Sequence, residues 1–215
     1  MKLTLPETLL LFGLHDDKGT VHSAAYLALD PGLRGATVVE LKLRGIVQVR
    51  TLDPGPDGRV GGEVRWTPDP PPPPRLPFLL AAMEALRKAP SPADVSTWLA
   101  ALAIEMPDLR AQVLASLEAR GVLGAPADDG PLPAVPVYDS TVEAALVQQV
   151  GWALEEADRI SPRLGSLVGL TVACHLGGVV FGDQADAADE RAAWVSERDA
   201  VLRAVVQSIG ETEGW

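Results

Sequence analysis

The feature of the sequence that most constrains its fold is an apolar stretch of 18 residues, Leu164–Phe181, without Asp, Glu, Lys or Arg. This length is at the lower limit for a helix that spans a membrane. The stretch also contains four glycines together with Ser166, Thr171 and His175. A helix that is apolar on all sides is equally typical of the centre of a helical bundle. We therefore favour a buried central helix over a membrane span, with His175 as a hydrogen-bonded core residue.

Helical spacing of apolar residues recurs along most of the remaining chain. A helix-start signal stands in Leu3–Leu14, where Thr4 can cap the helix and Pro6 and Glu7 occupy its first turn. Further apolar stripes predict helices over Ala36–Arg44, around residues 79–86, 95–102 and 109–117, and from Ser140 onward. A chain of 215 residues, 47 % of them hydrophobic, can bury a full core. We predict one mainly α-helical domain over residues 1–215.

Two segments interrupt the helical pattern with signals for β-hairpins. Ile46–Leu52 and Gly62–Thr67 read as paired strands joined by a loop rich in Gly and Pro. A second hairpin or an extended loop is predicted within residues 122–138. The five-proline run Pro70–Pro74 cannot enter a helix or a central strand, so we predict a stiff surface connector there. The sequence thus predicts a helical bundle with one or two β-hairpins at its edge.

Three segments of the sequence resemble the Golgi phosphoprotein 3 family. The first is the leucine-rich Leu3–Leu14 with the following Asp-Asp-Lys-Gly, and the third is Leu117–Leu123, read as a helix end before a hairpin. The second, Gly32–Gly45 with the sequence GLRGATVVELKLRG, is the most specific. Pro162-Arg163-Leu164, at the start of the apolar stretch, is also similar. These segments occur in the family's order over nearly the whole chain.

The resemblance implies a non-catalytic protein that binds phosphatidylinositol 4-phosphate in a basic pocket and dips an apolar hairpin into the bilayer. It implies that Arg34, between Gly32 and Gly35, contacts the head group together with Arg110. The earlier of two arginines expected near Arg110 falls on Pro107, and no tryptophan occupies residues 23–25, where the family's pocket tryptophan is expected. The membrane hairpin would contain Leu132, Val135, Val137 and Tyr138.

The physical chemistry of the same residues leaves two interpretations open. If Gly32–Gly35 opens a helix, its free N–H groups and the fork of Arg34 form an anion site. Otherwise the segment is an ordinary glycine-rich turn with Arg34 solvated or paired with an acid. Lys42, Arg44 and Arg120 either extend a basic face or are solvated or salt-bridged surface charges.

Other functional classes have less support in the sequence. The net charge of −11 disfavours nucleic acid as a partner. Cys174 is the single cysteine, and the three histidines lack metal-ligand spacing, so we predict neither a disulfide nor a metal site. No nucleophile motif, phosphate-binding loop or dinucleotide fingerprint is present, so we predict no enzyme activity and no cofactor.

We therefore predict a cytoplasmic peripheral membrane protein, because the N-terminal segment lacks the cleavage site of a signal peptide. Its ligand would be the head group of an anionic phospholipid, namely phosphatidylinositol 4-phosphate or a related lipid. A protein cargo and self-association are compatible with this role. The alternatives are a protein–protein adaptor and a winged-helix-like regulator, in which Ala36–Arg44 or Leu109–Arg120 would precede the wing. A DNA-binding version would need more Arg and Lys on either helix.

Overall fold

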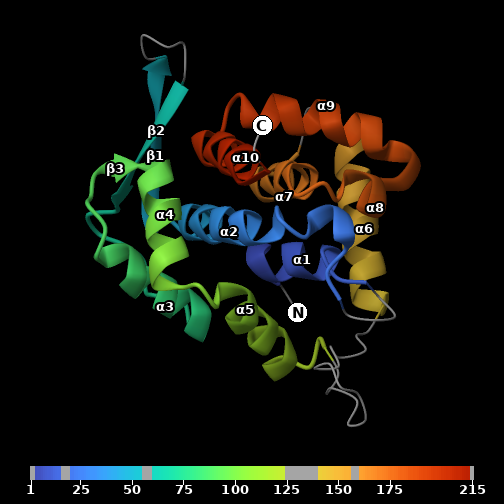
Figure 1. Ribbon diagram of the computed structural model, residues 1–215, viewed down its shortest axis with the longest axis horizontal. Coiled ribbons are helices and arrows are strands. Elements are labelled where there is room, and N and C mark those ends of the chain that lie inside the picture. Colours follow the sequence, from blue (N-terminus) through green and yellow to red (C-terminus); the bar gives the residue numbers. More distant parts are fainter. Residues whose placement is uncertain (1–2, 16–19, 55–59, 124–139, 156–159, 214–215) are drawn as a thin grey trace.

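The computed structural model describes residues 3–15, 20–54, 60–123, 140–155 and 160–213 (Figure 1). This part of the chain is mainly helical and includes one three-stranded antiparallel sheet, β1–β2–β3. The predicted fold class, mainly α with a β-hairpin at the edge, is confirmed. The helices are α1 (Leu5–Phe12), α2 (Leu29–Leu43), α3 (Pro77–Arg87), α4 (Val95–Glu105), α5 (Leu109–Ala119), α6 (Ser140–Glu155), α7 (Pro162–Ala173), α8 (Gly177–Phe181), α9 (Ala185–Ser196) and α10 (Ala200–Glu213). The strands are β1 (Val47–Pro54), β2 (Val60–Trp66) and β3 (Ala93–Asp94), and short 3₁₀ turns lie at Ser23–Ala25 and Gly182–Gln184.

The central element of the bundle is α2. It contacts α1, α4, α5, α7 and α10, and runs through the middle of the molecule in Figure 1. From Leu29 to Leu41 every residue is buried except Asp30 and Arg34. The stretch predicted as the central helix, Leu164–Phe181, contributes α7, which is buried from Gly165 to Thr171 and packs against α1, α2, α9 and α10. The helix predicted over Ala36–Arg44 is α2, and it begins earlier, at Leu29.

The apolar stretch Leu164–Phe181 is not one helix. α7 ends at Ala173, and His175 takes a left-handed backbone conformation with φ of 59° before α8 begins at Gly177. The N–H groups of His175 and Leu176 donate to the carbonyl oxygens of Val172 and Thr171, which is the Schellman pattern of a helix end. His175 is exposed, so its prediction as a core residue is also wrong.

No single helix in the described ranges combines the length and the hydrophobicity needed to cross a membrane. Pro162–Ala173 and Gly177–Ser196 are long and hydrophobic enough only when the two are taken together, and the chain bends by 119° between them.

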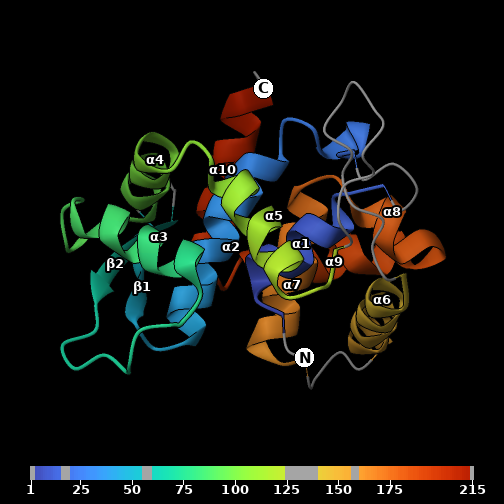
Figure 2. The ribbon, with the colours of Figure 1, turned by 90° about the horizontal axis from the view of Figure 1, so that it is seen from below.

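The sheet lies at one end of the molecule with α3 and α4, and α6 and α8 lie at the other end (Figure 2). β1 and β2 form the predicted hairpin, with Val47 opposite Trp66 and Val49 opposite Val64. The sequence did not predict β3, which adds two residues to the edge of β2. The second predicted hairpin, with Leu132, Val135, Val137 and Tyr138, lies outside the described residues.

Two further predictions hold in the structure. Thr4 caps α1: its side chain accepts from the Glu7 N–H, and the Glu7 carboxylate accepts from the Thr4 N–H, which completes a capping box. The proline run has no regular secondary structure, and its members are exposed except for Pro74. It is therefore a surface connector between β2 and α3.

Candidate functional site

Arg34 and Arg110 lie in one small pocket although they are far apart in the sequence. The pocket has a volume of about 200 Å³ and is formed by the N-terminal part of α2, the end of α4 and the start of α5. Figure 2 shows α2, α4 and α5 meeting on the side of the molecule where α2 begins. The residues that line the pocket are Asp30, Leu33, Arg34, Ala103, Met106, Pro107, Leu109 and Arg110.

Local structure explains why these two arginines meet. Asp30 and Arg34 are one turn apart on α2 and form the only part of residues 29–41 that reaches the surface. Pro107 stands between α4 and α5, where it cannot continue a helix. The chain turns there, and α5 restarts at Leu109 with Arg110 in its first turn.

Asp30 orients both guanidinium groups. Arg110 Nε donates to Asp30 Oδ1 over 2.7 Å, and Arg34 Nε donates to the Asp30 backbone oxygen over 3.2 Å. The terminal nitrogens of both arginines have no hydrogen-bond partner among the described residues. With two guanidinium groups and one carboxylate, the pocket carries a net positive charge within a strongly acidic chain.

Burial lowers the pKa of Arg34, and the nearby charge of Asp30 raises it in opposition. A guanidinium remains protonated under all ordinary conditions. The lowered pKa therefore reports a positive charge that has lost part of its hydration, and such a charge gains from contact with an anion.

Gly32 and Gly35 have a different function from the one predicted. They lie inside α2, and the Gly32 N–H donates to the Ala28 oxygen over 2.9 Å, so the predicted first-turn anion site is wrong. A β-carbon on Gly32 would lie 2.2 Å from Cys174 Sγ, and one on Gly35 would lie 2.0 Å from Val205 Cγ2. The two glycines thus allow close packing of α2 against neighbouring elements, and only Arg34 of this motif reaches the pocket.

The other basic residues considered for a basic face are salt-bridged. Lys42 Nζ lies 2.7 Å from Asp199 Oδ2, and Arg44 Nε lies 2.7 Å from Glu40 Oε1. Arg120 pairs with the buried Glu7. These three side chains therefore stabilise the fold and do not extend the pocket.

Sequence reasoning missed two buried carboxylates that join distant elements. Glu40 accepts from the Leu5 N–H over 2.9 Å and from Arg163 Nη1 over 3.0 Å. Arg163 also donates to the Leu3 oxygen over 2.6 Å, so it fixes the start of α1 to α7. Glu7 accepts from Ser116 and Arg120 of the α5 region. Their partners are remote in the sequence, and no local pattern predicts such pairs.

Three exposed apolar side chains are close in the sequence to residues that line the arginine pocket. Tyr26 is 65 % exposed and Leu27 is 53 % exposed, directly before α2, and Ile104 is 76 % exposed next to the pocket residue Ala103. In the part of the chain that the structure describes, no cluster of three His, Cys, Asp or Glu could hold a metal ion.

The sequence matches the model of one protein family, described as Golgi phosphoprotein 3 (GPP34), over residues 5–212. The matched range includes both arginines of the pocket and nearly all of the helices and strands. No curated protein matches the sequence at a significant level.

Proposed function

The chain belongs to the Golgi phosphoprotein 3 family, and from this premise we propose that it binds the phosphorylated head group of an anionic phospholipid at a membrane surface, with Arg34 and Arg110 as the ligand-binding residues. The role is that of a non-catalytic peripheral membrane protein. The observation that carries the proposal is the convergence of the two arginines in one pocket, where Asp30 holds both of them.

The hydrogen bonds of the pocket suit a phosphate ligand. Each guanidinium has five N–H donors, and Asp30 engages only the one on Nε. The four terminal donors of each arginine are thus available for paired hydrogen bonds, the geometry in which Arg recognises phosphate. Because Asp30 already fixes both side chains, binding loses less side-chain entropy.

The charge and size of the pocket favour a phosphomonoester over a phosphodiester. A phosphomonoester carries a charge of about −1.5 to −2 near neutral pH and offers three acceptor oxygens. A pocket of about 200 Å³ is smaller than sites for drug-sized ligands, so it suits a head group rather than a whole lipid. Phosphatidylinositol 4-phosphate or a related phospholipid has the required group.

Three exposed apolar side chains support a lipid surface rather than a free phosphate compound. Tyr26 and Leu27 directly precede α2 and Ile104 follows the pocket residue Ala103, so a bilayer whose head group occupied the pocket would be placed against these exposed apolar side chains. Attachment to membranes generally needs two weak signals, such as a charge contact together with apolar insertion. The net charge of −11 gives no general attraction to an anionic surface, so attachment depends on this site.

The test is co-sedimentation with vesicles of neutral lipid, of neutral lipid with phosphatidylserine, and of neutral lipid with phosphatidylinositol 4-phosphate. We expect the wild type to bind the last kind and the Arg34→Ala/Arg110→Ala variant to remain in the supernatant. The Arg34→Lys/Arg110→Lys variant keeps the charge but loses the fork, so it should bind much more weakly than the wild type. Arg50→Ala/Arg65→Ala removes the same charge from the exposed face of the hairpin and should bind normally.

Equal binding of the wild type to both anionic vesicles would reduce the site to a nonspecific basic surface. Absence of binding to every vesicle would contradict the proposal. Thermal unfolding followed by circular dichroism distinguishes loss of the pocket from loss of the fold.

A protein–protein adaptor is a second candidate, and a separate observation favours it. Trp194 on α9 is 45 % exposed, and the guanidinium carbons of Arg198 and Arg191 lie 4.3 Å and 5.5 Å from the centroid of its ring. Exposed Trp and Arg are enriched at the centres of protein interfaces. A partner whose binding is lost in Trp194→Ser but retained in Arg34→Ala/Arg110→Ala would establish this function.

A further inference from the structure

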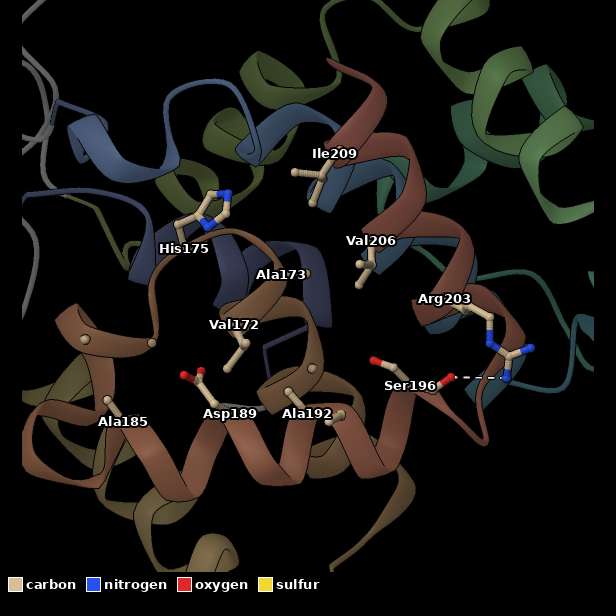
Figure 3. Close-up of a pocket in the computed structure, with 15 residues that line it drawn as sticks. Val172, Ala173, His175, Ala185, Asp189, Ala192, Ser196, Arg203, Val206 and Ile209 are labelled. Atoms are coloured by element: carbon tan, nitrogen blue, oxygen red, sulfur yellow. Dashed lines mark hydrogen bonds between the residues drawn. The ribbon is translucent and has the colours of Figure 1, made fainter. Parts of the chain in front are cut away.

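A second, larger pocket lies between α7, α8, α9 and α10 (Figure 3). Its volume of about 790 Å³ is within the range of sites that bind small organic molecules. None of the residues that line it lines the arginine pocket. Most of its walls are apolar, and the larger side chains among them are those of Val172, Val206 and Ile209.

The charge presented to this pocket is negative. Figure 3 shows the Asp189 carboxylate pointing from α9 into the space below Val172 and His175. Asp189 has no hydrogen bond or ion pair with any described residue. Gly177 faces this carboxylate, since a β-carbon on it would lie 3.6 Å from Asp189 Oδ1. Because glycine has no side chain, it leaves the carboxylate uncovered on this side.

Arg203 also lines the pocket, but its charged end is turned away from it. In Figure 3 the guanidinium points out of the pocket, and its Nη2 donates to the backbone oxygen of Ser196 over 3.2 Å. The same nitrogen donates to the Glu197 oxygen over 2.6 Å. To pair with Arg203, an anionic ligand would have to break these hydrogen bonds, and it would also lie next to the negative charge of Asp189. The pocket therefore disfavours anions.

We propose that this pocket binds an organic cation, with its ammonium group paired to Asp189 and its apolar body packed against Val172, Val206 and Ile209. The net charge of −11 attracts cations to the protein in general, and the uncompensated carboxylate fixes where the cation binds. This proposal rests on residues outside the arginine pocket and is independent of lipid binding.

The two parts of the ligand contribute unequally. A pair formed by an exposed carboxylate is weak, so the ammonium group should improve the affinity about two- to fivefold over an uncharged group. The apolar body supplies the larger part by removing its surface and that of the pocket walls from water. A useful probe series therefore keeps the body constant and changes only the charge.

The probes are 4-phenylbutylamine, 4-phenylbutan-1-ol and 4-phenylbutyrate, titrated into the ¹⁵N-labelled full chain and followed by NMR. We expect the amine to shift the amide signals of Ala173, Gly177 and Asp189. Its dissociation constant should be about two- to fivefold below that of the alcohol, and the carboxylate should bind most weakly. If the carboxylate binds as tightly as the amine, or if none of the probes shifts these signals, the proposal is overturned.

Three variants locate the cation. In Asp189→Asn the amine should bind no better than the alcohol, while binding of the alcohol is unchanged. Glu190→Gln removes the neighbouring exposed carboxylate of α9, which does not line the pocket, and should keep the preference for the amine. Ala193→Trp, at an exposed position that lines the pocket, should fill it and weaken all three probes. Equal effects of Asp189→Asn and Glu190→Gln would overturn the assignment of the carboxylate.

Discussion

Gly35 of α2 and Val205 of α10 are so close that a β-carbon on the glycine would lie 2.0 Å from Val205 Cγ2. Both residues are fully buried, and the other carbons of Val205 would lie only 3.2 and 3.3 Å from the added atom. A methyl group at this point must therefore separate α2 from α10 or displace Val205.

We expect Gly35→Ala to lower the free energy of unfolding. Overpacking a core costs about 1–3 kcal/mol, and the better helix propensity of Ala offsets up to about 1 kcal/mol of it, for a net loss of about 1–2 kcal/mol. Urea unfolding measures the difference. In a Val205→Ala background the same change should no longer destabilise, because the methyl group then has room.

Gly210 is the matched control, since it lies in α10 and an added β-carbon meets no atom within 4 Å. Gly210→Ala should raise the free energy of unfolding by about 0.4–1 kcal/mol through reduced entropy of the unfolded chain. If both substitutions raised the free energy of unfolding, helix propensity would outweigh packing at Gly35, and the predicted overpacking would be contradicted.

His175→Gly is expected to stabilise the protein. The left-handed conformation of His175, with φ of 59°, costs a residue with a β-carbon about 1–2 kcal/mol, and glycine adopts it without that cost. Allowing for the greater entropy of glycine in the unfolded chain, we expect a gain of about 0.5–1 kcal/mol in the free energy of unfolding. His175→Ala keeps the β-carbon and should give no gain, which separates backbone strain from any loss of imidazole contacts.

The ends of three helices show what the sequence could and could not predict. α2 and α5 end with Gly45 and Gly121 in the left-handed conformation, directly after the helix predicted over Ala36–Arg44 and within the helix end predicted in Leu117–Leu123. α7 ends with the same hydrogen-bond pattern, but its left-handed residue is His175. Without a glycine at that position the apolar stretch read as one continuous helix.

At the start of α2 the sequence predicted a break where the structure has a continuous helix, and tertiary packing explains this difference. Both interpretations of Gly32–Gly35, the opening of a helix and a glycine-rich turn, placed the two glycines outside a helix interior, where glycine is unfavourable. The helix continues through them because Cys174 and Val205 occupy the space that side chains would need. These partners are remote in the sequence, so no local pattern could reveal the close approach.

Of the pocket, the sequence indicated the two arginines and nothing of their surroundings. Arg34 and Arg110 followed from resemblance to a family, and the structure brings them together. The bridging role of Asp30 depends on how α2 and α5 pack, and so does the exposure of Tyr26, Leu27 and Ile104. Whether an apolar residue is exposed depends on how the whole chain folds. The periodicity of apolar residues in the sequence does not predict it.

The buried Glu7 should make the stability depend on pH. Burial raises the pKa of Glu7, but hydrogen bonds from the Thr4 backbone, Arg120, Thr4 Oγ1 and Ser116 together hold it below its usual value of 4.5. The folded state thus binds this proton less tightly than the unfolded state. The stabilisation is complete above pH 4.5 and is lost as the pH falls through the lower pKa of the folded state.

We expect Glu7→Gln to lower the free energy of unfolding at neutral pH by about 3 kcal/mol, because it leaves Arg120 without its buried partner charge. The difference from the wild type should shrink as the pH falls below 4.5, the usual pKa of the carboxyl group. Urea unfolding at a series of pH values measures it. Glu84→Gln, at an exposed position on α3, should leave the stability unchanged, and a constant difference for Glu7→Gln at every pH would contradict the assignment.

The exposed apolar residues Leu27 and Ile104 should contribute to membrane affinity if the proposed function holds. Leu27→Ser/Ile104→Ser removes two exposed apolar side chains and leaves both arginines in place. Partial burial of each side chain in the bilayer gives about 1 kcal/mol, so we expect binding to vesicles with phosphatidylinositol 4-phosphate to weaken by about tenfold or more. Vesicle co-sedimentation measures this change.

Leu80→Ser changes an exposed leucine on α3, outside the pocket, and should bind vesicles as the wild type does. If Leu80→Ser weakened vesicle binding as much as Leu27→Ser/Ile104→Ser does, the apolar contact with the bilayer would not be confined to the residues near the pocket.

The central position of α2 also determines when the protein can fold during its synthesis. Ribosomes make the chain from its N-terminus, so α2 emerges long before Cys174 and Val205, against which its two glycines pack. α1, α4 and α5 can cover part of α2 earlier, but its contacts with α7 and α10 must wait. The core therefore closes only after α10 has left the exit tunnel. Until then the apolar surface of α2 is exposed to chaperones and to other nascent chains.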